Sequence, residues 1–111
     1  MTELQNVNVD EARQLIANGA FLLDVREDDE FVLGHAPEAH HIALGEVPDH
    51  LEDLPKDAVI VSVCRSGGRS ARAGKFLLDQ GFDVVNLEGG MIAWAQSGAP
   101  LVADSGNPVI G

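Results

Sequence analysis

The chain has 111 residues, 45 % of them hydrophobic and 23 % charged, which is typical of one soluble globular domain. Seven basic residues stand against eighteen acidic ones, and the net charge of −11 excludes binding to nucleic acid or an anionic membrane through bulk charge. No apolar run approaches the roughly 18 residues of a membrane span, and residues 1–5 lack the features of a secretory signal, so we expect a cytoplasmic protein.

The first predicted element is a helix that begins after Asn8 and ends near Gly19. Asn8 is a favourable N-cap residue, and Glu11 three positions later resembles the second half of a capping box. Apolar residues between Ala12 and Ile16 follow the spacing of a core-facing helical stripe. We therefore expect an amphipathic helix here.

Short apolar runs then predict buried strands. Residues 21–25 predict a strand covered on both faces, and residues 59–63 form the clearest strand because four of their five side chains are β-branched and apolar. Between them, glycines and prolines punctuate residues 28–54, where we predict short helical turns around a brief strand at residues 41–42. The strand over residues 59–63 leads directly into Cys64.

The remaining chain predicts a glycine-containing loop, a helix that begins at about Ser70 and ends before Gly81, a strand over residues 84–87 and a helix around residues 91–94. This alternation predicts an α/β fold with a parallel sheet flanked by helices. We expect one domain that spans residues 1–111, in which the core covers about residues 7–100 and residues 101–111 form an irregular tail. 

Ligands of such folds bind beyond the carboxyl ends of the strands. By this interpretation Cys64, residues 24–26 and the turn at residues 88–90 all lie at that end of the sheet. We therefore place the candidate site there.

Cys64 is the single cysteine, so its neighbours decide between a buried structural residue and a working thiol. The six residues that follow comprise two glycines, two arginines and two serines, which are poor surroundings for an inert core residue. The glycines allow the backbone N–H groups of residues 66–68 to form an anion-binding nest, and the following helix N-terminus, Arg65 and Arg69 add positive charge. Such surroundings lower the pKa of a cysteine, so we predict that Cys64 is a nucleophilic thiolate or its persulfide anion.

Positive charge is concentrated near this cysteine. Arg65, Arg69, Arg72 and Lys75 are four of the seven basic residues and lie within twelve residues that begin at Cys64, which predicts a site for a small anion. The loop lacks the Gly-Lys-Ser/Thr ending of a nucleotide-binding P-loop, so ATP is not an expected ligand and no cofactor is predicted.

The segment from Cys64 to Ser70 resembles the active-site loop of the single-domain rhodaneses, the thiosulfate sulfurtransferase family. Residues 24–31, 34–39 and 87–94 agree with the family in order and spacing, although Glu38 replaces a glycine that the family usually has. The resemblance covers nearly the whole predicted core. It implies a three-layer fold with about five parallel strands between helices.

The resemblance also implies a chemistry, in which Cys64 takes a sulfur from an anionic donor such as thiosulfate or a persulfide and passes it to cyanide or a thiol. Thioredoxin or a sulfur-carrier protein are further candidate partners. Arg65 and Arg69 would bind the sulfonate of the donor. The implied substrate-binding loop comprises Arg65, Ser66, Gly67, Gly68, Arg69 and Ser70.

Two alternatives stay open. Dual-specificity phosphatases and arsenate reductases resemble rhodaneses but place five residues between cysteine and arginine, whereas four separate Cys64 from Arg69. A rhodanese domain without turnover of its own, acting in sulfur relay or protein interaction, is the other alternative, and the retained cysteine and arginines argue against it.

Several polar residues have structural explanations. We expect Asp24 and Arg26 to form an ion pair or a hydrogen-bonded bracket that supports the active-site loop from a second layer. His35 is expected to make structural hydrogen bonds. His40 and His41 have no acids or cysteines at metal-ligand spacing, so no metal site is predicted.

Overall fold

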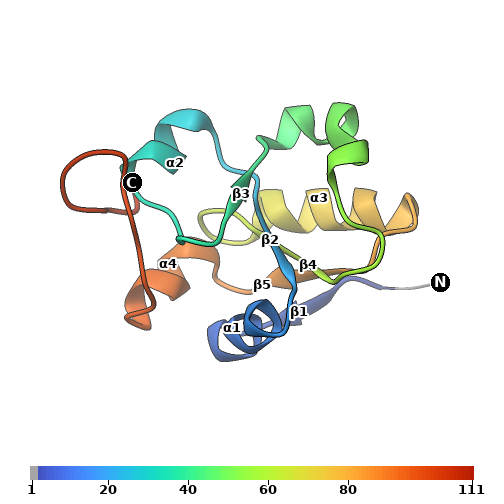
Figure 1. Cartoon of the computed structure of the whole chain (residues 1–111), viewed down its shortest axis with the longest axis horizontal. Helices are drawn as coiled ribbons and strands as arrows, with labels where there is room; N and C mark the ends of the chain where they lie inside the picture. Colours follow the sequence, from blue (N-terminus) through green and yellow to red (C-terminus); the bar gives the residue numbers. More distant parts are fainter. Residues whose placement is uncertain (1–2) are drawn as a thin grey trace.

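The computed structural model describes residues 3–111 and contains a five-stranded parallel sheet with helices on both faces (Figure 1). The predicted α/β fold is therefore confirmed. The strand order is β1-β5-β4-β2-β3. The strands are β1 (Gln5–Val7), β2 (Phe21–Asp24), β3 (His40–His41), β4 (Ile60–Val63) and β5 (Val84–Leu87). The helices are α1 (Val9–Ala17), α2 (Asp28–Leu33), the 3-10 segment η1 (Leu44–Asp53), α3 (Gly68–Asp79) and α4 (Gly90–Gln96).

Two apolar clusters fill the space on either side of the sheet. Helices α1 and α4 cover one face and α3 and η1 cover the other (Figure 1). Side chains alternate along β4, so Val61 packs with Trp94 of α4 while Ile60 packs with Leu77 of α3. Cys64 belongs to the α3 side. In residues 3–111, none of the helices has the length and apolar character needed to cross a bilayer.

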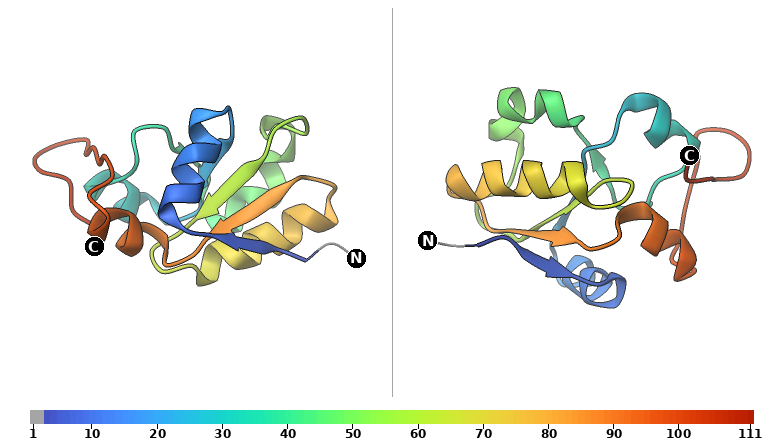
Figure 2. Two further views of the ribbon diagram at one scale, coloured as in Figure 1. Left: turned by 90° about the horizontal axis from the view of Figure 1, so that it is seen from below. Right: turned by 180° about the vertical axis from the view of Figure 1, so that it is seen from behind.

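The predicted elements are found within one or two residues, and helix α1 has the expected N-terminus. Glu11 N donates to Asn8 Oδ1 at 2.8 Å and Asn8 N donates to Glu11 Oε1 at 2.9 Å, which completes a capping box. The residue pattern alone missed β1. This strand is three residues long and largely exposed, and it exists because Asn6 and its neighbours pair with β5 (Figure 2, left).

Helix α3 begins at Gly68 instead of near Ser70. Gly67 adopts φ +116° and ends the loop, so the chain is helical from the next residue onward. The loop is therefore shorter than predicted, and Arg69 lies in the first helical turn.

The chain after α4 is irregular and packs against α2 (Figure 1). Val102 and His35 exchange two backbone hydrogen bonds of 2.9 Å, and Val109 N donates to Leu33 O at 2.9 Å. These contacts bring the C-terminal segment to the end of the sheet that carries the active-site loop.

Candidate active site

Cys64 follows β4 directly, and the loop that leads to α3 lies at the carboxyl end of the sheet (Figure 1). Helix α4 orients this loop, because Met91 N donates to Cys64 O at 2.8 Å and Ile92 N donates to Arg65 O at 3.1 Å. With the carbonyl groups turned toward α4, N–H groups of the loop are free to face the sulfur. Gly67 N donates to Cys64 Sγ at 3.1 Å.

The Cys64 thiol is 1 % exposed and is surrounded by hydrogen-bond donors. Burial raises its pKa, but the Ser70 hydroxyl, 3.3 Å from the sulfur, and the backbone N–H groups of Ser70, Gly67 and Ser66 lower the pKa by more. The net result is a pKa below the ordinary cysteine value. Hydrogen bonds are the largest of the effects that lower the pKa of Cys64. The sequence alone had emphasised the arginine charges instead.

Arg69 is held by Glu30 of α2, a residue that the sequence analysis did not select. The two guanidinium nitrogens of Arg69 bind the two carboxylate oxygens of Glu30 at 2.6 and 2.8 Å. The hydrogen bond from Arg69 lowers the pKa of Glu30 to about 2, and the same contact raises the pKa of Arg69. Arg65 is more exposed, and its Nε donates to Gly111 O at 2.6 Å. Both arginines therefore already bind acceptors within the protein.

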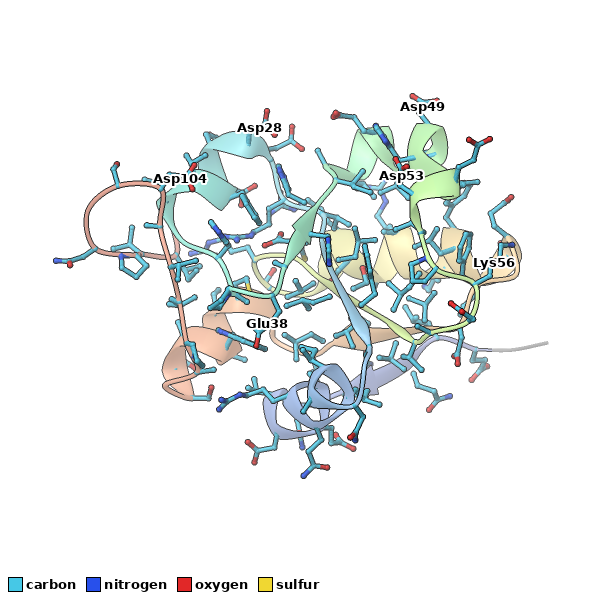
Figure 3. The ribbon with its side chains drawn as sticks, in the orientation of Figure 1. Asp28, Glu38, Asp49, Asp53, Lys56 and Asp104 are labelled. Atoms are coloured by element: carbon cyan, nitrogen blue, oxygen red, sulfur yellow. The ribbon has the colours of Figure 1, made fainter. Side chains whose placement is uncertain are left out.

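The ion pair between Glu30 and Arg69 predicts a pH dependence of stability. The pKa of Glu30 is about 2 in the folded protein and near its ordinary 4.5 after unfolding, so the stabilisation is complete above pH 4.5 and is lost as the pH falls toward 2. In Glu30→Gln the free energy of unfolding should fall less steeply over this range, as measured by urea unfolding at each pH. Glu38→Gln, which removes an exposed carboxylate, should keep the wild-type slope (Figure 3). Equal slopes in all three proteins would contradict the assignment.

Asp24 and Arg26 form a buried ion pair, as expected. Arg26 Nη2 lies 2.7 Å from Asp24 Oδ2, and both side chains are at most 1 % exposed. The other hydrogen bonds of the guanidinium reach Gly34 O at 2.8 Å and Glu30 O at 3.4 Å. The pair therefore contacts the backbone of α2 and of Gly34, and its connection to the active-site loop runs through Glu30 and Arg69.

The histidines make structural contacts. His35 stacks on Phe31 and its Nδ1 lies 2.7 Å from Phe31 O, which fits the role expected for it. His41 Nε2 lies 2.6 Å from Arg26 O, and His40 stacks on Phe21. Within residues 3–111 no three His, Cys, Asp or Glu side chains are grouped so that they could hold a metal ion.

A hollow of about 550 Å³ beside β3 does not include the active-site loop. Asp28 and Asp53, two of its lining residues, carry negative charge along the margin formed by α2 and η1 (Figure 3). Carboxylates disfavour an anionic ligand, so we do not assign the anion site expected from the sequence to this hollow. The lining residues are Phe21, Asp28, His40, His41, Ile42, Ala43, Glu46, His50 and Asp53.

The family model of the Rhodanese-like domain matches residues 8–97, a range that contains Cys64 and its loop. The chain belongs to the rhodanese-like family. Among curated relatives of this chain, the sulfurtransferase YtwF of Bacillus subtilis is 51 % identical over 67 % of this chain and 72 % of its own. The thiosulfate sulfurtransferase GlpE of Pseudomonas aeruginosa is 37 % identical over 81 % of this chain and 83 % of its own.

Solved structures agree with the fold. A rhodanese-like domain protein from Staphylococcus aureus is 34 % identical and superposes with a TM-score of 0.82, covering 92 % of this chain and 100 % of that chain. The resemblance read from the sequence is thereby confirmed, and the sheet and helices described above are those of a rhodanese domain.

Proposed function

We propose that this rhodanese is a sulfurtransferase that moves a sulfane sulfur from thiosulfate or a persulfide donor to a thiophilic acceptor through a persulfide on Cys64. The observation that carries the proposal is the position of Cys64 Sγ, at the end of a buried strand and within reach of the donors Gly67 N and Ser70 Oγ. These donors favour a sulfur anion, which is the reactive form of the residue. Membership of the family and a thiosulfate sulfurtransferase relative support the same chemistry.

In the first half-reaction, the Cys64 thiolate attacks the outer sulfur of thiosulfate. A new sulfur–sulfur bond forms, the bond between the outer sulfur and the sulfonate group breaks, and sulfite leaves with the electron pair. The negative charge of the thiolate is then carried by the outer sulfur of the persulfide. The N–H groups of residues 66–68 and of Ser70 would stabilise this anion.

In the second half-reaction, cyanide or a thiolate attacks the outer sulfur, and Cys64 Sγ leaves with the electron pair of the broken bond. The protein returns to the thiolate, and the acceptor leaves as thiocyanate or as a persulfide. Two half-reactions that share one covalent intermediate predict ping-pong kinetics.

Arg65 and Arg69 would bind the sulfonate of the donor and the departing sulfite. Their present partners are Gly111 O and Glu30, so binding of a donor requires the guanidinium groups to add a ligand or to exchange one. The exposed Arg65 exchanges its partner more easily than Arg69, which is held by two charged hydrogen bonds. We therefore assign Arg65 to the first contact with the donor.

We place the reaction in the cytoplasm, where low-molecular-weight thiols, thioredoxin or a sulfur-carrier protein would serve as acceptors. A role in sulfur relay without free turnover is a second candidate function. It would be favoured if a protein acceptor took the sulfur far faster than cyanide does.

Intact-mass spectrometry tests the proposal. After incubation of the reduced protein with thiosulfate, we expect a mass increase of one sulfur atom that a reducing agent removes. Cys64→Ser should show no such increase, while Ser97→Ala, a change in the chain after α4, should show the wild-type adduct. The proposal is wrong if the wild-type protein takes up no sulfur, and efficient hydrolysis of a phosphate ester would favour the phosphatase alternative.

A further inference from the structure

Polar side chains form a row across the sheet on the α3 side, beside the active-site loop. Asn86 of β5 is in register with Ser62 of β4 on one side and with Asn6 of β1 on the other. Residues in register on neighbouring parallel strands point to the same face of the sheet. Asn86 is 4 % exposed and Ser62 is fully buried. Burying a polar side chain costs free energy unless the side chain is hydrogen-bonded. The hydrogen-bond partners of these residues therefore indicate their role.

The row reaches Cys64 through the hydroxyl group of Ser70. Ser70 Oγ lies 2.6 Å from Asn86 Oδ1, 3.2 Å from Gly67 O and 3.3 Å from Cys64 Sγ. Asn86 Nδ2 donates to Asn6 Oδ1 at 3.1 Å, which leaves its Oδ1 directed at Ser70. A hydroxyl group carries one hydrogen, so these three acceptors compete for it, and the shortest distance is to Asn86.

We propose that Asn86 is a positioning residue that accepts the Ser70 hydrogen whenever Cys64 Sγ is uncharged and yields it whenever Sγ is a thiolate. This inference rests on the proposed sulfur transfer, in which Sγ alternates between these two states. When Sγ attacks the donor it loses its charge, and the Ser70 hydrogen returns to Asn86 Oδ1. When the acceptor takes the sulfur, Sγ receives the electron pair and the hydroxyl rotates toward it. The hydrogen stays bonded to Ser70 throughout.

This competition balances two requirements of the reaction. A thiolate that receives an additional hydrogen bond is a better leaving group but a weaker nucleophile, because nucleophilicity falls with the pKa of the thiol. Because Ser70 must give up its hydrogen bond to Asn86 in order to donate to Sγ, Asn86 limits how strongly the attacking thiolate is stabilised, and Ser70 still donates to Sγ when Cys64 leaves. One serine hydroxyl group thus serves both half-reactions.

The test is the pH dependence of Cys64 alkylation by iodoacetamide in the reduced protein. Asn86→Leu removes the acceptor with the shortest distance at similar side-chain volume, so only Gly67 O still competes with Cys64 Sγ for the Ser70 hydrogen. The midpoint of the alkylation profile should fall by about 1 pH unit, and the rate constant at high pH should fall about threefold. Asn86→Ala removes the same acceptor without a bulky side chain and should shift the midpoint in the same direction.

A double-mutant cycle separates this role from a purely structural one. Ser70→Ala should raise the midpoint, and Asn86→Leu should have no further effect in the Ser70→Ala background. Ser62→Ala is the matched control, because Ser62 Oγ donates to the backbone oxygen of Ser70 at 3.0 Å and not to its hydroxyl group. It should lower stability and leave the midpoint where it is.

An unchanged or raised midpoint in both Asn86 variants would overturn the inference, as would an equal shift with and without the Ser70 hydroxyl. Alkylation does not require sulfur transfer, so failure of the proposed function is distinguishable. A protein that shows the coupled midpoints but takes no sulfur from thiosulfate would refute the function and retain Asn86 as a residue that controls ionisation of Cys64.

Discussion

Asp24→Asn is expected to lower the free energy of unfolding by about 3–5 kcal/mol, because it leaves the Arg26 guanidinium buried without its counter-ion. Asparagine preserves the size of the side chain, so the effect reports the lost charge and not a cavity. The variant should also loosen α2, since the guanidinium donates to Gly34 O and approaches Glu30 O. Urea unfolding followed by circular dichroism measures the loss as a lower midpoint at unchanged slope.

Asp53→Asn provides the comparison for this effect. Asp53 pairs with His50 at 3.0 Å, but both side chains are largely exposed and the pair is screened by solvent. We expect no change in the unfolding midpoint outside experimental error. Similar small changes in both variants would show that the Asp24–Arg26 pair does not have the stabilising role assigned to it.

Gly90→Ala should disrupt the active-site loop. Gly90 has φ +57°, and a Cβ atom at this position would collide with the carbonyl groups of Cys64 and Arg65. Those carbonyl groups accept hydrogen bonds from α4, so the collision displaces the backbone that surrounds the sulfur. Backbone strain and overpacking together should cost about 3 kcal/mol or more. The alkylation midpoint of Cys64 should rise as the donors move away.

Gly98→Ala separates the cost of backbone strain from the cost of overpacking. Gly98 has φ +78°, and a Cβ atom there would meet no other atom within 4 Å. Its alanine variant should therefore lose only the roughly 1–2 kcal/mol of a left-handed backbone and keep the wild-type alkylation profile. If Gly90→Ala behaved like Gly98→Ala in both measurements, close packing of α4 against the loop would not matter for the site.

Elements with strong local patterns could be predicted from the sequence. The capping box of α1 and the β-branched run before Cys64 depend on residues that are neighbours in the chain, and both are present as predicted. The placement of Cys64 before a glycine-containing loop and a helix likewise follows from consecutive residues. Strand β1 was missed because its three residues, Gln5–Val7, acquire their conformation from pairing with β5.

The partners of the site residues could not be predicted because they are distant in sequence. Glu30 and Arg69 are separated by 39 positions, and Glu30 lies on α2, whose backbone Arg26 contacts. Asn86 and Asn6 are 80 positions apart and meet only when β1 joins the sheet. A single sequence shows which side chains can pair but not which strands will be neighbours.

The order of the strands has a consequence for association between molecules. The two edges of the sheet are β1, with three residues, and β3, with two, so each edge presents few unpaired backbone groups. Longer strands β2, β4 and β5 occupy the interior, where both sides are paired. Short edges are a poor template for a strand of another molecule. The arrangement that buries the strand before Cys64 also leaves only short edges, which disfavour edge-to-edge association of this chain.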